Sequence, residues 1–144
     1  MAIKVNISDK DGKTYKVEVE PSVLEGKELL ETIKGEDLSS DLTGYEFVIT
    51  AASDKSGFMS RAEIDGVGMK KILLGYGKGM HKKPKGDKKI GTKPSGLRLR
   101  KTVRGKVLSM DTRQVNTKVT KVGTKKLSEI YAKPVEGEEA SKTE

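Results

Sequence analysis

The segment from residue 77 to residue 106 carries more positive charge than a folded core can absorb, and this limits what the chain can build there. Between Lys78 and Lys106, twelve Lys or Arg accompany a single acid, Asp87. Such a run repels itself unless counter-charge arrives, so we expect it to form a surface for a polyanion. Glycines and prolines interrupt its first half and disfavour regular structure. The sequence therefore predicts a long, mobile basic loop over residues 77–96.

The second half of the basic segment has the two-residue period of a half-buried strand. Apolar residues alternate there with arginines: Leu97, Leu99 and Val103 against Arg98, Arg100 and Arg104. We expect a strand over residues 97–104 that presents its arginines to the polyanion. The candidate binding residues of the loop and the strand are Lys78, His81, Lys82, Lys83, Lys85, Lys88, Lys89, Lys93, Arg98, Arg100, Lys101, Arg104 and Lys106.

The charge is distributed unevenly along the 144 residues, whose net charge is +8. Residues 1–66 hold 8 basic and 14 acidic side chains, residues 67–133 hold 20 and 3, and residues 134–144 hold 1 and 4. A chain of this length predicts one domain with one lean apolar core. We assign residues 1–133 to a single β-rich domain and expect residues 134–144 to be an acidic, disordered tail.

Short stretches of alternating apolar residues, separated by turn residues, predict a mainly β fold. The expected strands are a hairpin of residues 3–7 and 15–19, a buried strand at 71–74, and strands at 45–50, 97–104 and 115–119. Residues 51–57 are expected to be a polar loop. Ser22 and Glu25 have the spacing of a capping box and predict a short helix over 22–33, although Gly26 also suits a turn before a shorter helix.

Residues 127–131 predict a last helical turn, because their apolar side chains recur at helical spacing. Together the elements predict a small β domain, barrel-like or a sandwich, with one or two short helices and a long basic loop.

The inventory of reactive side chains argues against catalysis. The chain has no cysteine and a single histidine, His81, within a loop where nothing would hold the ring in one orientation. Asp54, Glu63 and Asp65 lack a histidine or a second carboxylate at the spacing of metal ligands. We therefore expect no enzymatic activity, no cofactor, no metal site and no small-molecule substrate.

Folded RNA is the polyanion that fits this segment best. A membrane surface would require apolar anchors among the lysines of a helix, and the segment holds glycine, proline and threonine instead. The same glycines and prolines argue against a helix that reads DNA, and Tyr76 is the only aromatic residue nearby for stacking single strands. The remaining possibility is recognition of folded RNA through its sugar-phosphate backbone and its shape.

The expected compartment is the cytoplasm. No apolar run approaches the length of about 18 residues that a membrane span needs. Met1 is followed by an alternating strand pattern and not by an apolar signal region. We expect no membrane partner.

Three motifs resemble a known family in their order and spacing. They are SDKSGFM at residues 53–59, ILLxYGxG at residues 72–79 and GLRLRKTVRG at residues 96–105, of which the last is the most specific. They are similar to the archaeal and eukaryotic small-subunit ribosomal protein six, the "six-e" type. The resemblance implies a barrel-like protein embedded in the small ribosomal subunit, with small-subunit rRNA and neighbouring ribosomal proteins as partners.

The chain departs from that family in two places. The family often has Gly-Phe-Pro-Met where this chain has Gly57, Phe58 and Met59 without the proline. Eukaryotic members continue into a long basic helix with phosphorylated serines, whereas this chain ends in an acidic segment. The resemblance is therefore to the short archaeal form, and regulation by kinases is not carried over.

The charge and the resemblance together predict a structural component of the small ribosomal subunit that binds and stabilises folded rRNA through the basic loop and the arginine-bearing strand. Two alternatives remain open: an enzyme acting on RNA, such as a nuclease or modification enzyme, and a free nucleic-acid chaperone or transcription factor. Incubation with RNA and Mg²⁺ distinguishes the enzyme, and sedimentation away from small subunits distinguishes the free protein.

Overall fold

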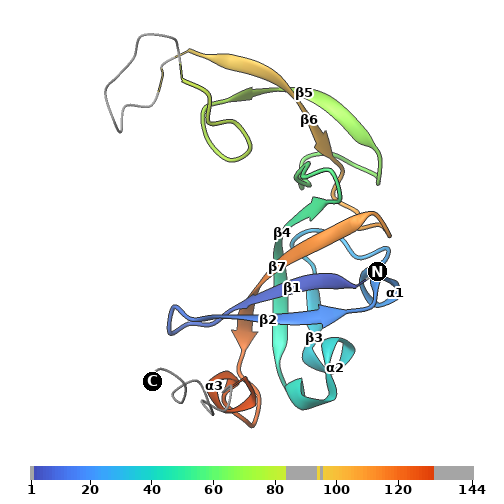
Figure 1. Cartoon of the computed structure of the whole chain (residues 1–144), viewed down its shortest axis with the longest axis vertical. Helices are drawn as coiled ribbons and strands as arrows, with labels where there is room; N and C mark the ends of the chain where they lie inside the picture. Colours follow the sequence, from blue (N-terminus) through green and yellow to red (C-terminus); the bar gives the residue numbers. More distant parts are fainter. Residues whose placement is uncertain (1, 84–93, 95, 132–144) are drawn as a thin grey trace, which may run out of the picture.

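Five strands form the main sheet of the protein, in a computed structural model that describes residues 2–83, 94 and 96–131. The strands are β1 (Ile3–Ser8), β2 (Thr14–Val19), β3 (Thr32–Lys34), β4 (Glu46–Asp54) and β7 (Thr112–Lys121). Their order is β2-β1-β7-β4-β3, with β1 and β7 parallel and the other neighbours antiparallel. The sheet curls into a half-barrel (Figure 1), which confirms the predicted mainly β, barrel-like fold.

Short helical turns and the inward residues of the sheet share one apolar core. The described helices are α1 (Pro21–Leu24), α2 (Gly35–Leu38) and α3 (Leu127–Ile130), and a 3-10 turn, η1, covers Ser40–Leu42. Alternate residues of β1, β4 and β7 are buried against leucines from these turns. The core members from the turns are Leu24, Leu38, Leu42 and Leu127.

The opening hairpin is confirmed, and its turn explains its register. The backbone N–H of Asp9 donates to the carbonyl of Lys13 at 2.9 Å, which closes the loop between β1 and β2. Gly12 has a φ of 81°, a conformation that glycine adopts at little cost. Ile3 therefore pairs with Val19 and Ile7 with Tyr15, so the apolar residues of both strands face the core.

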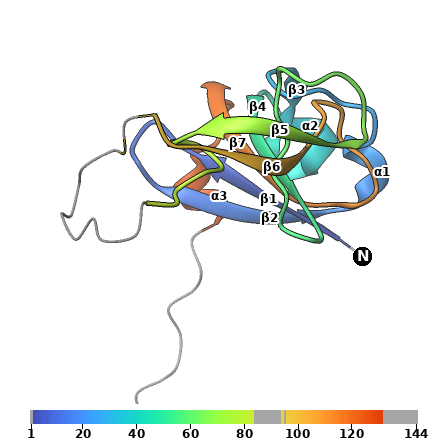
Figure 2. The same cartoon turned by 90° about the horizontal axis from the view of Figure 1, so that it is seen from above.

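Strands β5 (Met69–Gly75) and β6 (Arg98–Arg104) form a separate two-stranded ribbon, which we call the arm. Figure 1 shows the arm beyond the ends of β4 and β7, and Figure 2 shows it crossing above the main sheet. A second apolar cluster forms there, whose buried members are Ile64, Leu74, Met80 and Val103. The expectation of a single core is wrong, because the arm buries its apolar face against its own connecting segments.

The helix predicted over residues 22–33 is wrong beyond its first turn. Helix α1 ends at Leu24, and Gly26 has a φ of 80°, which is not helical. Of the apolar residues that follow, Ile33 lies in β3, which pairs with β4. The predicted capping box is also absent: Glu20 is the N-cap residue, no side chain caps it, and Pro21 occupies the first turn.

The strand predicted at residues 71–74 lies within β5, but it is not buried as a whole. Leu74 is buried while Lys71 and Leu73 are exposed, because a two-stranded ribbon covers only one of its faces here. Strand β4 continues to Asp54, through residues predicted as loop.

The strands predicted at residues 45–50, 97–104 and 115–119 are confirmed as β4, β6 and β7, and the last helical turn is confirmed as α3. The basic loop predicted over residues 77–96 falls mostly outside the described residues, as does all of the tail predicted at 134–144.

Candidate nucleic-acid interface

The register of the arm fixes which side chains share a face. Directly opposite residues of an antiparallel pair point to the same face. Leu73 lies opposite Arg100, Gly75 opposite Arg98, and Lys71 opposite Thr102. One face of the arm, which we call the open face, is therefore lined by Met69, Lys71, Leu73, Arg98, Arg100 and Thr102.

The opposite face of the arm is covered by the second apolar cluster. Leu74 and Leu99 lie opposite each other there, and the side chains of Ile64 and Met80 belong to the same cluster. Lys101 shares this face by register but remains exposed. The cluster supports one face of the ribbon. The other face is exposed except at Thr102 and at Arg104, which lies opposite Met69 at the end of the ribbon.

Arg98 and Arg100 are both exposed on the open face. Within the part of the chain that the structure describes, neither guanidinium forms an ion pair. Residues two apart on a strand are separated by about 6.7 Å, so the two arginines can reach neighbouring groups of one partner. The planar guanidinium binds phosphate through two parallel hydrogen bonds, which suits this pair to a nucleic-acid backbone.

A tight turn after β5 positions the first residues of the predicted basic loop. Gly77 and Met80 exchange backbone hydrogen bonds of 2.8 and 3.0 Å. The guanidinium of Arg61 donates to the carbonyl of Lys78 at 2.7 Å, which ties the turn to the segment before β5. The side chain of Lys78 is left exposed.

The residues after this turn extend the basic surface. Lys82 is exposed and Lys83 is half-buried. The exposed ring of His81 lies edge-on to Tyr76, with the ring centroids 5.9 Å apart. Four further candidates lie outside the described residues: Lys85, Lys88, Lys89 and Lys93.

Arg104 occupies a different place from the other two arginines of β6, because its side chain is only 11% exposed. Its Nε donates to the Asp54 carboxylate at 2.8 Å, its Nη2 to that of Asp111 at 3.0 Å, and its Nη1 to the hydroxyl of Ser109 at 3.2 Å. We call this group the junction cluster. It ties the end of β6 to the end of β4 and to the segment before β7. Arg104 therefore joins the arm to the sheet and is not one of the exposed candidate binding residues.

The Asp54 carboxylate is buried at the centre of the junction cluster and is fully engaged. Its Oδ1 accepts the backbone N–H groups of Ser56 and Phe58 at 2.8 and 2.9 Å, while Oδ2 accepts from Arg104. The hydrogen bond to Asp54 is the first cause that raises the pKa of Arg104 above its ordinary value. Residues 53–59, one of the three family motifs, thus form a turn around the Asp54 carboxylate, which in turn binds Arg104.

Acid is expected to weaken the junction cluster through Asp111. Hydrogen bonds from Lys55, first, and from Arg104 hold the pKa of the Asp111 carboxyl below its usual value. A depressed pKa gives stability that is present above the unfolded value, near 3.9, and is lost as pH falls through the folded value.

Asp111→Asn is therefore expected to be less stable than the parent at neutral pH and to lose less stability than the parent at lower pH. Urea unfolding of both proteins between about pH 2 and 6 measures this difference. Parallel stability curves for the two proteins across that range contradict the assignment.

Lys106 is likewise occupied by intramolecular partners. Its amine lies 3.1 Å from carboxylate oxygens of both Glu28 and Asp65. The pKa of Lys106 is raised above its usual value, mainly by the hydrogen bond to Asp65 and next by the hydrogen bond to Glu28. The structure therefore separates Lys106 from the arginines of the open face.

The acids considered from sequence as metal ligands are paired with cations. Asp54 binds Arg104, Asp65 binds Lys106, and a carboxylate oxygen of Glu63 lies 3.7 Å from a guanidinium nitrogen of Arg61. Among the described residues no three potential metal ligands come together.

Sequence reasoning missed the contribution of β5. It placed Leu73 in a core and left Lys70 and Lys71 outside the basic segment, although both lysines are exposed on the arm. The missing information was the pairing of β5 with β6, which brings segments about thirty residues apart into register. The adjacent lysines before the apolar run were the only local signal.

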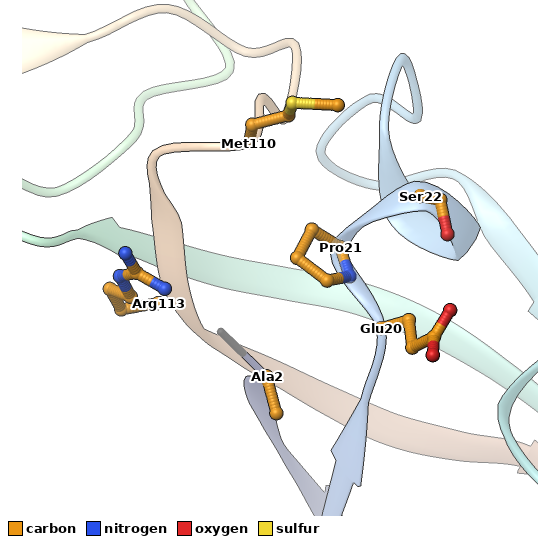
Figure 3. A pocket seen from close by; sticks show the side chains of 6 residues that line it. All are labelled: Ala2, Glu20, Pro21, Ser22, Met110 and Arg113. Atoms are coloured by element: carbon orange, nitrogen blue, oxygen red, sulfur yellow. The ribbon is translucent and has the colours of Figure 1, made fainter.

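A hollow lies at the start of β1, outside the open face of the arm (Figure 3). Its lining residues are Ala2, Glu20, Pro21, Ser22, Met110 and Arg113. Figure 3 shows the Arg113 guanidinium and the Glu20 carboxylate on opposite sides of Pro21, so the charged groups do not converge on one ligand.

No helix among the described residues is long and apolar enough to span a membrane.

Comparison with known proteins places these features in a family. The family model described as Ribosomal protein S6e matches residues 3–132. Proteins named "Small ribosomal subunit protein eS6" are similar over most of the chain. That of Methanococcus maripaludis (strain C7) is 40% identical over 125 residues, covering 86% of this chain and 91% of the relative. Those of Methanosphaera stadtmanae and Archaeoglobus fulgidus are 37% and 39% identical, covering 96% and 91% of this chain and 99% and 96% of the relatives.

Proposed function

Because the chain belongs to the ribosomal protein S6e family, we propose that it binds small-subunit rRNA through the arm and the basic segment that joins β5 to β6. The family is one of structural proteins of the small ribosomal subunit, and this chain is a component of that subunit. Its relatives carry the name of a subunit protein and not that of an enzyme. Neighbouring small-subunit proteins are further proposed partners.

The observation that carries the proposal is the pair of exposed arginines on the open face. Arg98 and Arg100 stand on a ribbon whose other face is packed, so their positions are fixed by the second apolar cluster. The two strands of the arm contain six basic residues and no acid. A polyanion is the partner that such a ribbon attracts.

The proposed mechanism is phosphate neutralisation on a fixed scaffold. Each neutralised phosphate releases condensed counterions, and this release supplies binding free energy that decreases as salt is added. The backbone of a packed ribbon is already ordered, so binding through its arginines costs less conformational entropy than binding through an unstructured segment. The arm would thereby fix the relative positions of RNA segments without any chemical step.

We also propose that residues 1–133 act as one rRNA-binding unit. The junction cluster connects β6 to β4 and to the segment before β7 through Arg104, and Lys106 adds ion pairs to Glu28 and Asp65. The arm is therefore attached to the sheet through ion pairs as well as through the chain itself.

Arg98→Ala combined with Arg100→Ala is expected to weaken binding to small-subunit rRNA and to flatten its salt dependence. The slope of log K against log salt should become less steep by about 0.9 for each duplex phosphate that the variant no longer neutralises. Filter binding of the purified protein to rRNA extracted from small subunits, at a series of salt concentrations, measures the slope.

Lys16→Ala combined with Lys118→Ala is the matched control, because it removes the same charge from exposed positions on the main sheet. This variant should keep the parent slope. Equal slopes for the parent and the arginine variant would overturn the assignment of the arm as the rRNA-binding element.

A further inference from the structure

The open face of the arm exposes large apolar side chains as well as arginines. Leu73 is 57% exposed and Met69 is 55% exposed, and Val67, two residues before Met69, is 43% exposed. Within β5, Met69, Lys71 and Leu73 follow the two-residue period, so these three side chains lie on one side of the strand. Leu73 lies directly opposite Arg100. The face is therefore mixed: an apolar strip beside a cationic one.

The apolar strip does not help the arm to fold. The cluster that supports the arm is on the other face, around Leu74 and Val103. Exposed apolar surface costs hydration free energy, whereas a polar residue on the open face would support the strand equally well. Met69 and Leu73 are separated by Lys71 on β5 and share their face with two exposed arginines, and this combination indicates a contact surface.

The charge of the arm identifies the class of partner. Every charged side chain in β5 and β6 is basic, and within the described residues Arg98 and Arg100 have no acidic partner. Strand β5 is also followed in the chain by the basic segment after Gly75. A protein partner would need an unusually acidic surface, whereas an RNA helix offers phosphates beside the apolar faces of its riboses.

We propose that the open face docks in the shallow minor groove of an RNA double helix, with Leu73 and Met69 against ribose surfaces and Arg98 and Arg100 on the flanking phosphates. This inference rests on the proposed function. It specifies that the RNA is double-helical and that Leu73 and Met69 contact it. The minor groove of A-form RNA is wide and shallow and displays its riboses. Leucine and methionine are among the side chains that DNA-binding proteins place in minor grooves.

The spacing of the residues agrees with such a contact. Leu73 and Met69 are four residues apart on β5, about 13 Å, and Lys71 lies between them. Leu73 and Arg100 are cross-strand neighbours with Cβ atoms about 5 Å apart. An apolar contact and a phosphate contact can thus be made side by side by one pair of residues.

The test is Leu73→Thr combined with Met69→Thr, because threonine keeps the preference for a strand while removing the apolar surface. Binding to a blunt RNA duplex is expected to weaken about tenfold, as when an aliphatic side chain buried in an interface is removed. The salt slope should not change, since no charge is removed. A DNA duplex of the same sequence, whose minor groove is narrower, should show no such weakening.

Met110→Thr combined with Val122→Thr is the matched control. Both residues are exposed apolar side chains outside the arm, at 62% and 51%. This variant should bind the RNA duplex as the parent does. Thermal unfolding of both variants verifies that the fold is intact.

The inference and the proposed function fail in distinguishable ways. If the threonine variant of the arm binds RNA like the parent while Arg98→Ala with Arg100→Ala loses salt dependence, the rRNA-binding function stands and the minor-groove contact is wrong. If the threonine variant binds RNA normally but no longer enters small subunits, the strip contacts a protein and the inference is overturned. Unchanged RNA binding by both variants would refute the proposed binding of rRNA through the arm.

Discussion

Replacing Arg104 by Met is expected to lower the free energy of unfolding by about 3–5 kcal/mol, the range found when one partner of a buried ion pair is removed. The side chain of Asp54 is 1% exposed, so its charge would stay buried without the guanidinium. The backbone N–H groups of Ser56 and Phe58 would still stabilise one carboxylate oxygen, which keeps the destabilisation within this range. Urea unfolding of the purified protein at neutral pH measures the difference.

Two further variants decide whether this destabilisation comes from the junction cluster. Lys101→Met removes the same charge from an exposed position of β6 and should change stability by less than about 0.5 kcal/mol. Asp54→Asn added to Arg104→Met should recover part of the stability, because the uncompensated buried charge is then gone. If the Arg104→Met protein were as stable as the parent but bound rRNA poorly, Arg104 would be an RNA-binding residue and not a structural one.

The different roles of the three arginines in β6 could not be predicted from their pattern. Arg98, Arg100 and Arg104 have the same parity in the sequence, so alternation assigns them one side of a strand. What separates Arg104 is Asp54, fifty residues earlier, together with Asp111 after the strand ends. Local periodicity reports the face of a residue but contains nothing about a distant carboxylate.

The hairpin and strands β4, β6 and β7 could be predicted because their signals are local. β-branched residues alternate with polar ones, and turn residues separate the runs. The segment after α1 lacked such a signal: Leu29 and Ile33 have the spacing of a helix face. There the backbone N–H of Leu29 donates to the carbonyl of Lys106 at 2.9 Å, and β3 pairs with β4. Tertiary hydrogen bonds thus overrode the apparent helical period.

The presence of two apolar clusters could also not be predicted from the sequence. Val103 and Leu108 are close in the chain and both apolar, which suggested continuous packing. In the structure Val103 belongs to the arm's cluster and Leu108 to that of the sheet. Gly105 lies between them, where the chain passes from one cluster to the other.

Gly105→Ala is expected to destabilise the protein by about 3 kcal/mol, the upper end of the usual cost of overpacking. A Cβ at this position would lie 1.8 Å from the carbonyl oxygen of Gly66 and 2.6 Å from its carbonyl carbon. Both are backbone atoms, so no side-chain rotation relieves the clash. The backbone of residues 64–68 would have to move away from that of 105–107.

That movement would break specific hydrogen bonds at the base of the arm. Gly105 donates to the carbonyl of Gly68 at 3.1 Å, and Lys106 donates to that of Ile64 at 2.8 Å. Hydrogen exchange should therefore show earlier loss of protection in β5 and β6 than in β1 and β7, because local opening begins where the hydrogen bonds are weakened.

Gly75→Ala is the control that separates steric overlap from any general effect of replacing a glycine. Gly75 lies in β5, a Cβ there would meet no atom within 4 Å, and its φ is outside the left-handed region. Alanine at this position should be neutral or slightly stabilising, because it restricts the unfolded chain. If both alanine variants were equally stable, the close approach at Gly105 would not constrain the junction, and the ion pairs of Arg104 and Lys106 with the backbone hydrogen bonds would hold the arm.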